Sequence, residues 1–117
     1  MNYKKLYQLL KASLLNYSIW VLDDRALAYC AKIKKEKALI VIHPDSSWKD
    51  KLLSLAHETG HMFKFGKEMQ LKWSWDGDEE TANKFAIEYL KKIGVSSKIF
   101  YNHYTKACRY SRTGKLK

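Results

Sequence analysis

Residues 55–63, LAHETGHMF, place two histidines four positions apart, with a glutamate directly after the first. In a helix, residues four apart lie on one face, one turn above the other. His57 and His61 would then present two imidazoles side by side, the arrangement that binds a metal ion such as Zn²⁺. Glu58 would face the adjacent open position, where a carboxylate can take a proton from a metal-activated water. This HExxH pattern predicts a zinc site; the alternative is an ordinary helix surface on which the glutamate pairs with charged neighbours.

A catalytic zinc site also needs a third protein ligand and an open fourth position. Downstream, the segment DEETANKFAIEYL (78–90) offers several acids on a predicted helix. Glu79 shares one helical stripe with Asn83 and with two alanines, which are small enough to let this helix pack closely against the HETGH helix. We therefore predict that Glu79 is the third ligand. Asn83 is expected to bond the second ring nitrogen of a ligating histidine.

The remaining polar residues near this pattern are not expected to bind the metal. Glu80 is rotated about 100° from Glu79 and is expected to face solvent. Acids at the start of this helix also suit the positive end of its dipole. Three residues nearer the C-terminus are candidate donors to an oxyanion by residue type alone: Tyr101, His103 and Tyr104. For these three the pattern favours the alternative, an aromatic face packed on the core.

The elements that would position these residues begin with a helix over 3–15, where apolar side chains recur at helical spacing. Ser47 and Asp50 form a capping box, so a second helix is expected from about Trp48, through the HETGH motif, to about Phe65. Between these helices, β-branched and aromatic residues predict three strands, at 18–22, 26–33 and 37–43.

After the HETGH helix we expect a loop over 67–77, and then a helix that is capped by an aspartate and ends near Gly94. A last helix is expected over about 97–110, leading into a basic tail at about 109–117. The expected fold is α+β and forms a single domain over 1–117. It comprises an N-terminal helix, a small three-stranded sheet, the active-site helix, the helix with the third ligand, and a C-terminal helix.

Composition favours a folded globular domain, because 46% of the 117 residues are hydrophobic and only one is proline. No apolar run approaches a membrane span, and the first residues lack the features of a signal peptide, so we expect a cytoplasmic protein. Cys30 and Cys108 are accordingly expected to be reduced thiols.

The net charge of +10 is unevenly spread, since the chain from Lys98 onward has six basic residues and no acid. A basic end is typical of a nucleic-acid contact, of a contact with an acidic protein, or of a surface that only confers solubility. No nucleic-acid-binding motif accompanies it, and the sequence gives no indication of the oligomeric state.

Two segments resemble the ImmA/IrrE-like zinc metallopeptidase family, whose pattern is an apolar turn, HExGH, and then a helix reading ExxANxFA. Here they are LSLAHETGH and EETANKFA, and the preceding strand and turn, ALIVIHPDSSWKDKL, are also similar, so the resemblance covers about residues 18–92. More broadly, the pattern resembles the thermolysin-like zincins, in which a glutamate on the second helix binds zinc. The resemblance implies a minimal zincin-like fold with these roles: His57, His61 and Glu79 as zinc ligands, Glu58 as general base, and Asn83 as support for a ligand.

The resemblance further implies a zinc endopeptidase that hydrolyses a peptide bond in a specific cytoplasmic protein. It suggests as substrate a transcriptional repressor of a phage or mobile element, of the helix-turn-helix type. The alternative is a non-catalytic zincin-fold module that acts through its basic C-terminal region on DNA or a protein partner. Glu58 favours the peptidase, because a purely structural zinc site has no use for a base at that position.

Overall fold

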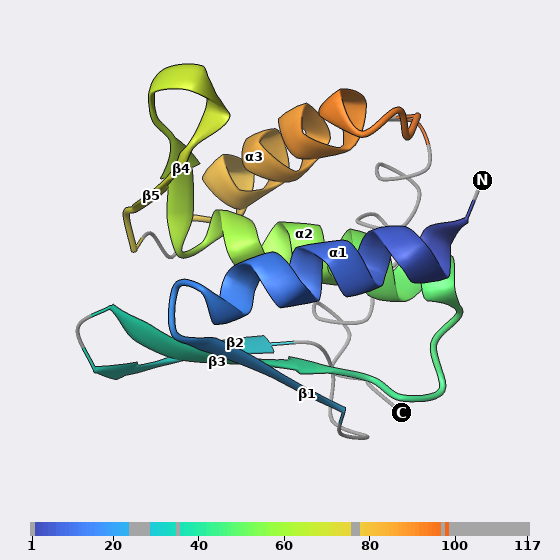
Figure 1. The fold of residues 1–117 in the computed structure, drawn as a ribbon, viewed down its shortest axis with the longest axis horizontal. Helices are drawn as coiled ribbons and strands as arrows, with labels where there is room; N and C mark the ends of the chain where they lie inside the picture. The colour runs from blue at the N-terminus through green and yellow to red at the C-terminus, as the bar shows by residue number, and fades with distance from the viewer. Residues whose placement is uncertain (1, 24–28, 35, 76–77, 97, 99–117) are drawn as a thin grey trace.

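The computed structural model describes residues 2–23, 29–34, 36–75, 78–96 and 98 (Figure 1). Within these, the chain forms three helices, five strands and one short 3₁₀ turn, in this order: α1 (Tyr3–Leu15), β1 (Ile19–Asp23), β2 (Tyr29–Lys34), β3 (Lys37–Ile42), α2 (Trp48–Gly60), β4 (Phe63–Phe65), the 3₁₀ turn (Lys67–Met69), β5 (Leu71–Trp73) and α3 (Glu79–Lys92). The α+β class predicted from the sequence is confirmed.

The larger sheet has the strand order β1-β3-β2. Strand β3 pairs with β1 in parallel and with β2 in antiparallel fashion. Alternate residues of β3 point to one face, and three of them, Ala38, Ile40 and Ile42, are buried in the main core. Because these three apolar side chains share one face, the sheet can carry helices on that face.

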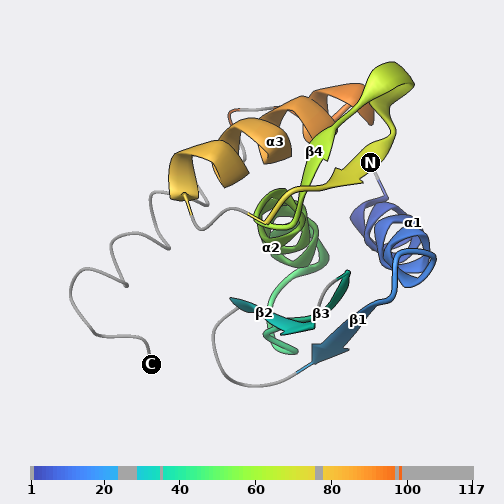
Figure 2. The same cartoon turned by 90° about the vertical axis from the view of Figure 1, so that its left-hand side faces the viewer.

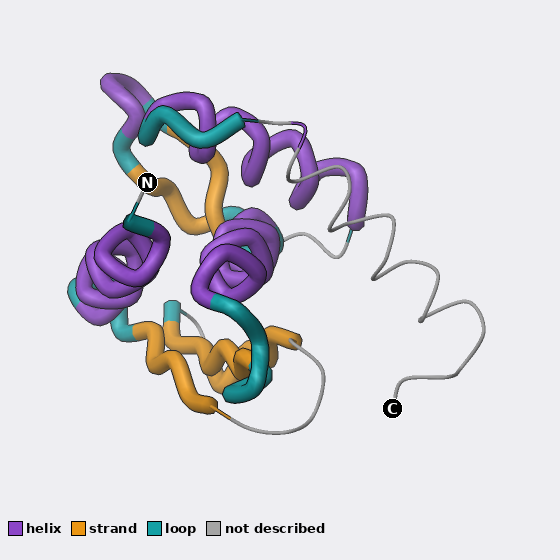
Figure 3. Tube along the Cα trace, turned by 90° about the vertical axis from the view of Figure 1, so that its right-hand side faces the viewer, coloured by secondary structure: helices purple, strands orange, loops and turns teal. Residues whose placement is uncertain are grey.

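Helices α1 and α2 lie side by side on that face of the sheet, and α3 with the β4–β5 hairpin forms a further layer beyond α2 (Figures 2 and 3). Helix α2 is therefore central, and its Leu52, Leu53 and Leu55 are fully buried. Burying each of these side chains contributes about 1.5–3 kcal/mol to folding. The helix that carries the histidines is thus the one most firmly held by the core.

The helix starts are set by side-chain caps, which satisfy backbone N–H groups that lack a partner within the helix. Asn2 accepts from the backbone N–H of Lys5 at 3.0 Å at the start of α1. Ser47 accepts from the backbone N–H of Asp50 at 3.1 Å, which confirms the predicted start of α2. With 13 or 14 residues each, the described helices are too short to cross a membrane.

Two expectations about the segment after the HETGH motif are wrong. The helix expected to reach Phe65 ends at Gly60, and the loop expected over 67–77 contains the 3₁₀ turn and strand β5. The reason is a pairing across the chain: β4 pairs with β5 in antiparallel fashion, with Phe63 opposite Trp73. Phe63 is buried and its ring lies 4.6 Å from that of Trp73, so tertiary packing overrides the helical pattern here.

The other boundaries differ by few residues from those predicted. The strands expected at 18–22, 26–33 and 37–43 are found at β1, β2 and β3, and the predicted N-terminal helix has the bounds of α1. The expected last helix, over 97–110, and the basic tail lie outside the described residues, apart from Lys98.

Candidate metal centre

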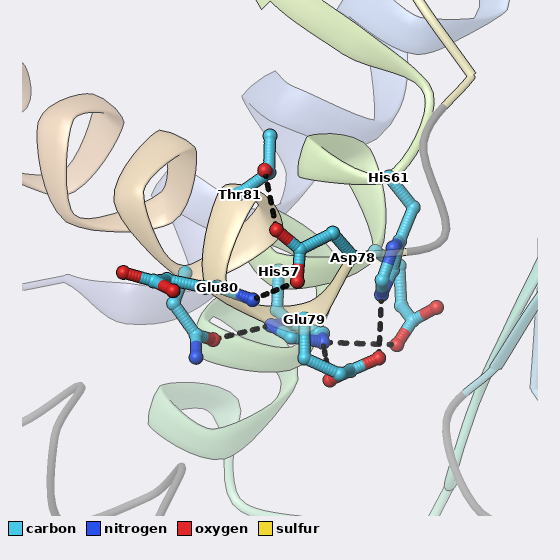
Figure 4. A network of polar contacts seen from close by, with 8 residues as sticks. His57, His61, Asp78, Glu79, Glu80 and Thr81 are labelled. Atoms are coloured by element: carbon cyan, nitrogen blue, oxygen red, sulfur yellow. Dashed lines mark hydrogen bonds and ion pairs between the residues drawn. The ribbon is translucent and has the colours of Figure 1, made fainter.

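The two imidazoles lie together at the C-terminal end of α2 (Figure 4). His57 is in the last turn, and His61 follows the helix with helical backbone angles (φ −75°, ψ −21°), so the spacing of one turn is kept. Their ring centroids are 4.9 Å apart and their planes are nearly perpendicular, at 89°. Both side chains are largely shielded, with 14% of His57 and 8% of His61 exposed.

Glu79, the first residue of α3, places its carboxylate across both rings (Figure 4). Its Oε2 lies 3.0 Å from His57 Nε2, and its Oε1 lies 3.0 Å from His61 Nε2. The side chain of Glu79 is 56% exposed, so this side of the cluster is open to solvent. Two imidazole nitrogens at the end of α2 therefore each contact one oxygen of a single carboxylate from α3.

Asn83, one turn after Glu79, fixes the orientation of the first ring. Its Oδ1 lies 2.8 Å from His57 Nδ1. With the amide oxygen as acceptor, Nδ1 carries the proton and Nε2 presents its lone pair to the cluster. The 3.0 Å distance from His57 Nε2 to the Glu79 carboxylate fits a metal ion bound by both groups, and it equally fits a hydrogen bond from a protonated ring. The contact between Asn83 and the His57 ring is the one that the sequence predicted.

Glu58 lies on the inner side of the cluster, where only 7% of the residue is exposed. Its Oε1 is 4.0 Å from His57 Nε2, farther than either oxygen of Glu79 lies from its imidazole partner. The donor atoms of His57, Glu58 and His61 all lie within 4.8 Å of one another. This group could hold a metal ion, and Glu58 could either bind that ion directly or stand beside it.

The close approach of α3 to α2 depends on Gly60. A Cβ at this position would lie 2.6 Å from the carbonyl oxygen of Ala82 and 2.8 Å from its Cα. The absent side chain lets the backbones meet at Ala82, which lies between Glu79 and Asn83 on the same face of α3. The turn without a side chain at Gly60 is therefore what lets α3 approach α2 this closely.

The two acids that flank Glu79 in sequence, Asp78 and Glu80, have separate partners, so they do not compete with it. The side chain of Asp78 accepts from Thr81 Oγ1 at 2.9 Å and from the backbone N–H of Glu80 at 3.2 Å. These hydrogen bonds, the one from Thr81 first, lower the pKa of Asp78 below its ordinary value. Glu80 pairs with Lys84 at 3.5 Å, and both side chains are exposed, as expected for the solvent face.

The sequence did not predict the open hollow of about 430 Å³ between the β4–β5 hairpin and α3. Its walls include Phe65 and Phe85, whose rings stack with centroids 4.4 Å apart. The alternation of Phe63, Lys64 and Phe65 was the signal that could have revealed this strand. The three residues considered as oxyanion donors by residue type lie outside the described residues: Tyr101, His103 and Tyr104.

Comparison of the chain with models of protein families, with curated proteins and with solved structures found no match. Membership of the family that HETGH and EETANKFA resemble is therefore a proposal. The site is defined by the chain's own geometry: two imidazoles, one carboxylate across them, and a second carboxylate beside them.

Proposed function

We propose that the protein is a zinc-dependent peptidase of the ImmA/IrrE-like, zincin-fold type. The observation that supports this most strongly is the convergence of His57 Nε2, His61 Nε2 and the Glu79 carboxylate, with Glu58 directly beside them. Three protein ligands with an open side are the arrangement of a catalytic zinc site, whereas structural sites are closed by four.

The donor set suits zinc in type and spacing. Neutral imidazole nitrogen and carboxylate oxygen are both common zinc ligands, at about 2.0–2.2 Å from the metal. In a tetrahedron with such bonds, neighbouring ligand atoms are about 3.3 Å apart. The two nitrogen–oxygen distances, one to each oxygen of the Glu79 carboxylate, are 3.0 Å and so are close to this spacing.

We assign Glu79, and not Glu58, as the third ligand. Each carboxylate oxygen of Glu79 is 3.0 Å from an imidazole nitrogen, while Glu58 Oε1 is 4.0 Å from His57 Nε2. Glu79 also lies on the helix that carries the partner of the His57 ring, so one element sets both contacts. In this assignment Glu58 lies beside the metal position without binding the ion. That is the place where a general base is needed.

A zinc ion held there supplies Lewis-acid activation of a water molecule and of a peptide carbonyl. Glu58 takes the proton from the attacking water and delivers it to the leaving amine nitrogen. Its burial keeps bulk water away from this transfer. Asn83 keeps the His57 ring in the tautomer that presents Nε2 to the metal. The exposed side of the cluster, at Glu79, leaves room for a substrate to approach.

For the substrate we propose a specific protein, on the basis of the family resemblance, with a transcriptional repressor of a phage or mobile element as the leading candidate. The peptide bond is the group that this constellation is suited to hydrolyse, since it supplies an activated water, a polarised carbonyl and a proton for the amine.

The experiment that tests this function replaces Glu58 by Gln and compares it with Glu80→Gln, a matched change at an exposed acid of the neighbouring helix. Zinc content is measured by mass spectrometry of the metal, and cleavage is measured on a quenched-fluorescence peptide library and on denatured casein. We expect both variants to keep zinc, and Glu58→Gln alone to lose about 10²–10⁴-fold in cleavage rate.

Full cleavage by Glu58→Gln would refute the assigned base. A wild-type protein that binds zinc but cleaves neither these materials nor a helix-turn-helix repressor encoded beside it would instead favour the non-catalytic alternative, in which the zincin-like domain acts by contact with DNA or a protein.

A further inference from the structure

Strand β1 forms one edge of the larger sheet, and among the described residues only β3 pairs with it (Figures 1 and 2). The backbone N–H of Ala38 donates to the carbonyl of Ser18 at 3.4 Å, which sets the phase of this parallel pairing. Since alternate residues of a strand turn their peptide groups to the same neighbour, those of Ile19 and Val21 point away from β3. Such a row of outward N–H and C=O groups is a template for another strand.

The side chains from Ile19 to Leu22 do not protect this edge. Trp20 and Leu22 project from the face of the sheet opposite the helices and are 44% and 53% exposed, while Ile19 and Val21 are buried. Natural edge strands are commonly blocked by lysine, proline or a bulge. The segment from Ile19 to Leu22 has none of these, and its pairing with β3 is regular throughout. The edge therefore has the character of an interaction surface.

The charge distribution indicates which partner suits this edge. The chain carries 22 basic residues and a net charge of +10, so two copies repel each other over most of their surfaces. Residues 12–24 are the longest stretch without lysine or arginine, and β1 lies within it. An acidic partner would be drawn to the basic surfaces elsewhere. A second copy, by contrast, meets the least repulsion here.

We propose that two copies of this chain associate through β1, paired in antiparallel fashion about a two-fold axis at Val21. A two-fold axis brings the same patch of both copies together, so the strand is its own complement. In this register Val21 lies opposite Val21 of the partner subunit. The outward N–H and C=O groups of the two residues then bond to each other. Trp20 faces the partner subunit's Leu22 in the closely spaced type of pair, about 4.5 Å between Cα atoms, so the two exposed side chains cover each other.

The dimer leaves the candidate metal centre accessible. Strand β1 packs against α1, whereas the centre is built on α2 and α3. The proposal is thus independent of the peptidase assignment, and zinc binding and cleavage are expected to be the same in monomer and dimer. A five-residue edge buries less surface than a standard interface, so we expect dissociation at about micromolar concentrations.

The test is sedimentation equilibrium of the full chain between about 1 and 500 µM, which brackets the expected dissociation constant. We expect a reversible rise from the chain mass of 13.8 kDa to twice that value. Leu22→Lys places a charge on the paired face and should raise the dissociation constant by at least about tenfold. Leu9→Lys is the matched control, because Leu9 is similarly exposed, at 57%, but lies on α1. This variant should dimerise as the wild type does.

Circular dichroism of both variants checks that each is folded, and hydrogen exchange of the β1 amides provides a second readout. In the dimer the Val21 amide should become protected as concentration rises. A wild-type chain that stays monomeric at 500 µM, or a concentration-independent protection of that amide, would overturn the proposal. So would equal dissociation constants for Leu22→Lys and Leu9→Lys.

Discussion

Gly60→Ala tests whether the contact between α2 and α3 builds the metal centre. The added Cβ would lie 2.6 Å from the Ala82 carbonyl oxygen, 2.8 Å from the Ala82 Cα and 3.0 Å from the Phe85 Cβ. Ordinary contacts begin at 3.4 Å, so the helices must separate by about 0.8 Å at this point. The closest atoms belong to the backbone, so no change of side-chain rotamer relieves the overlap.

The magnitude follows from this geometry. Overpacking of this kind costs typically about 1–3 kcal/mol, and the upper part of this range applies because a helix backbone must move. The gain in helix propensity from Gly to Ala offsets at most about 1 kcal/mol. A net loss of about 2 kcal/mol is a large share of a total stability of about 5–15 kcal/mol.

The same displacement reaches the zinc site. A shift of about 0.8 Å stretches the 2.8 Å contact between His57 Nδ1 and Asn83 Oδ1 beyond hydrogen-bond range. Losing a bond that orients a ligating histidine typically weakens metal binding by about 10–100-fold. We therefore expect Gly60→Ala to lower both the stability of the metal-free protein and its affinity for zinc.

The assay is guanidinium unfolding with a chelator present, followed by zinc titration against a competing chelator. Working without metal separates the packing cost from stability that bound zinc adds. Gly66→Ala is the control: its Cβ would meet nothing closer than 3.7 Å, so its stability should lie within about 0.5 kcal/mol of wild type. If Gly60→Ala is as stable as Gly66→Ala and binds zinc equally well, the close helix contact is not what assembles the site.

Three further changes probe single contacts. Glu79→Ala should weaken zinc binding by more than about 100-fold in a competition titration, while Glu80→Ala should leave it unchanged; the reverse order would show that the wrong acid was chosen. Asn83→Leu should weaken zinc binding by about 10–100-fold through the loss of the bond to the histidine ring, and an unchanged affinity would contradict that role. Asp78→Ala should lower the melting temperature at pH 6, because Asp78 caps α3. Since hydrogen bonds lower its pKa, this contribution is present above the ordinary value of 3.8 and is lost as pH falls through the lowered pKa. The difference in melting temperature between the two proteins should accordingly narrow below about pH 4, and a constant difference would refute the assignment.

The parts of the fold that the sequence predicted well depend on local signals. The capping side chain of Ser47 and the apolar spacing in 3–15 act over a few residues, and the structure confirms the helix starts that they indicate. The β4–β5 hairpin was missed because its pairing joins residues that a local pattern does not connect. Phe63 continues the apolar face of the HETGH helix in sequence, whereas in the structure it pairs with Trp73 and its ring contacts those of Trp73 and Tyr17.

In the candidate site, too, the local contacts follow directly from the sequence, whereas the contacts between helices depend on tertiary packing. The proximity of His57 and His61 follows from helical spacing, which the sequence contains directly. The placement of Glu79 depends on how two helices cross, and the small residues indicated a close approach without giving its distance. Gly60 lies at this crossing, and the structure shows that the backbone of Ala82 occupies the space beside it.

The most direct test of the central claim is the position of zinc itself in a crystal of the full chain grown with zinc, located by anomalous scattering at the zinc absorption edge. We expect one strong peak with His57 Nε2 and His61 Nε2 at about 2.0–2.1 Å and a Glu79 oxygen at about 2.0–2.2 Å, with Glu58 beside the ion but not bound to it. A peak ligated by Glu58 with Glu79 turned away, or no zinc between the two histidines, would contradict the proposed site.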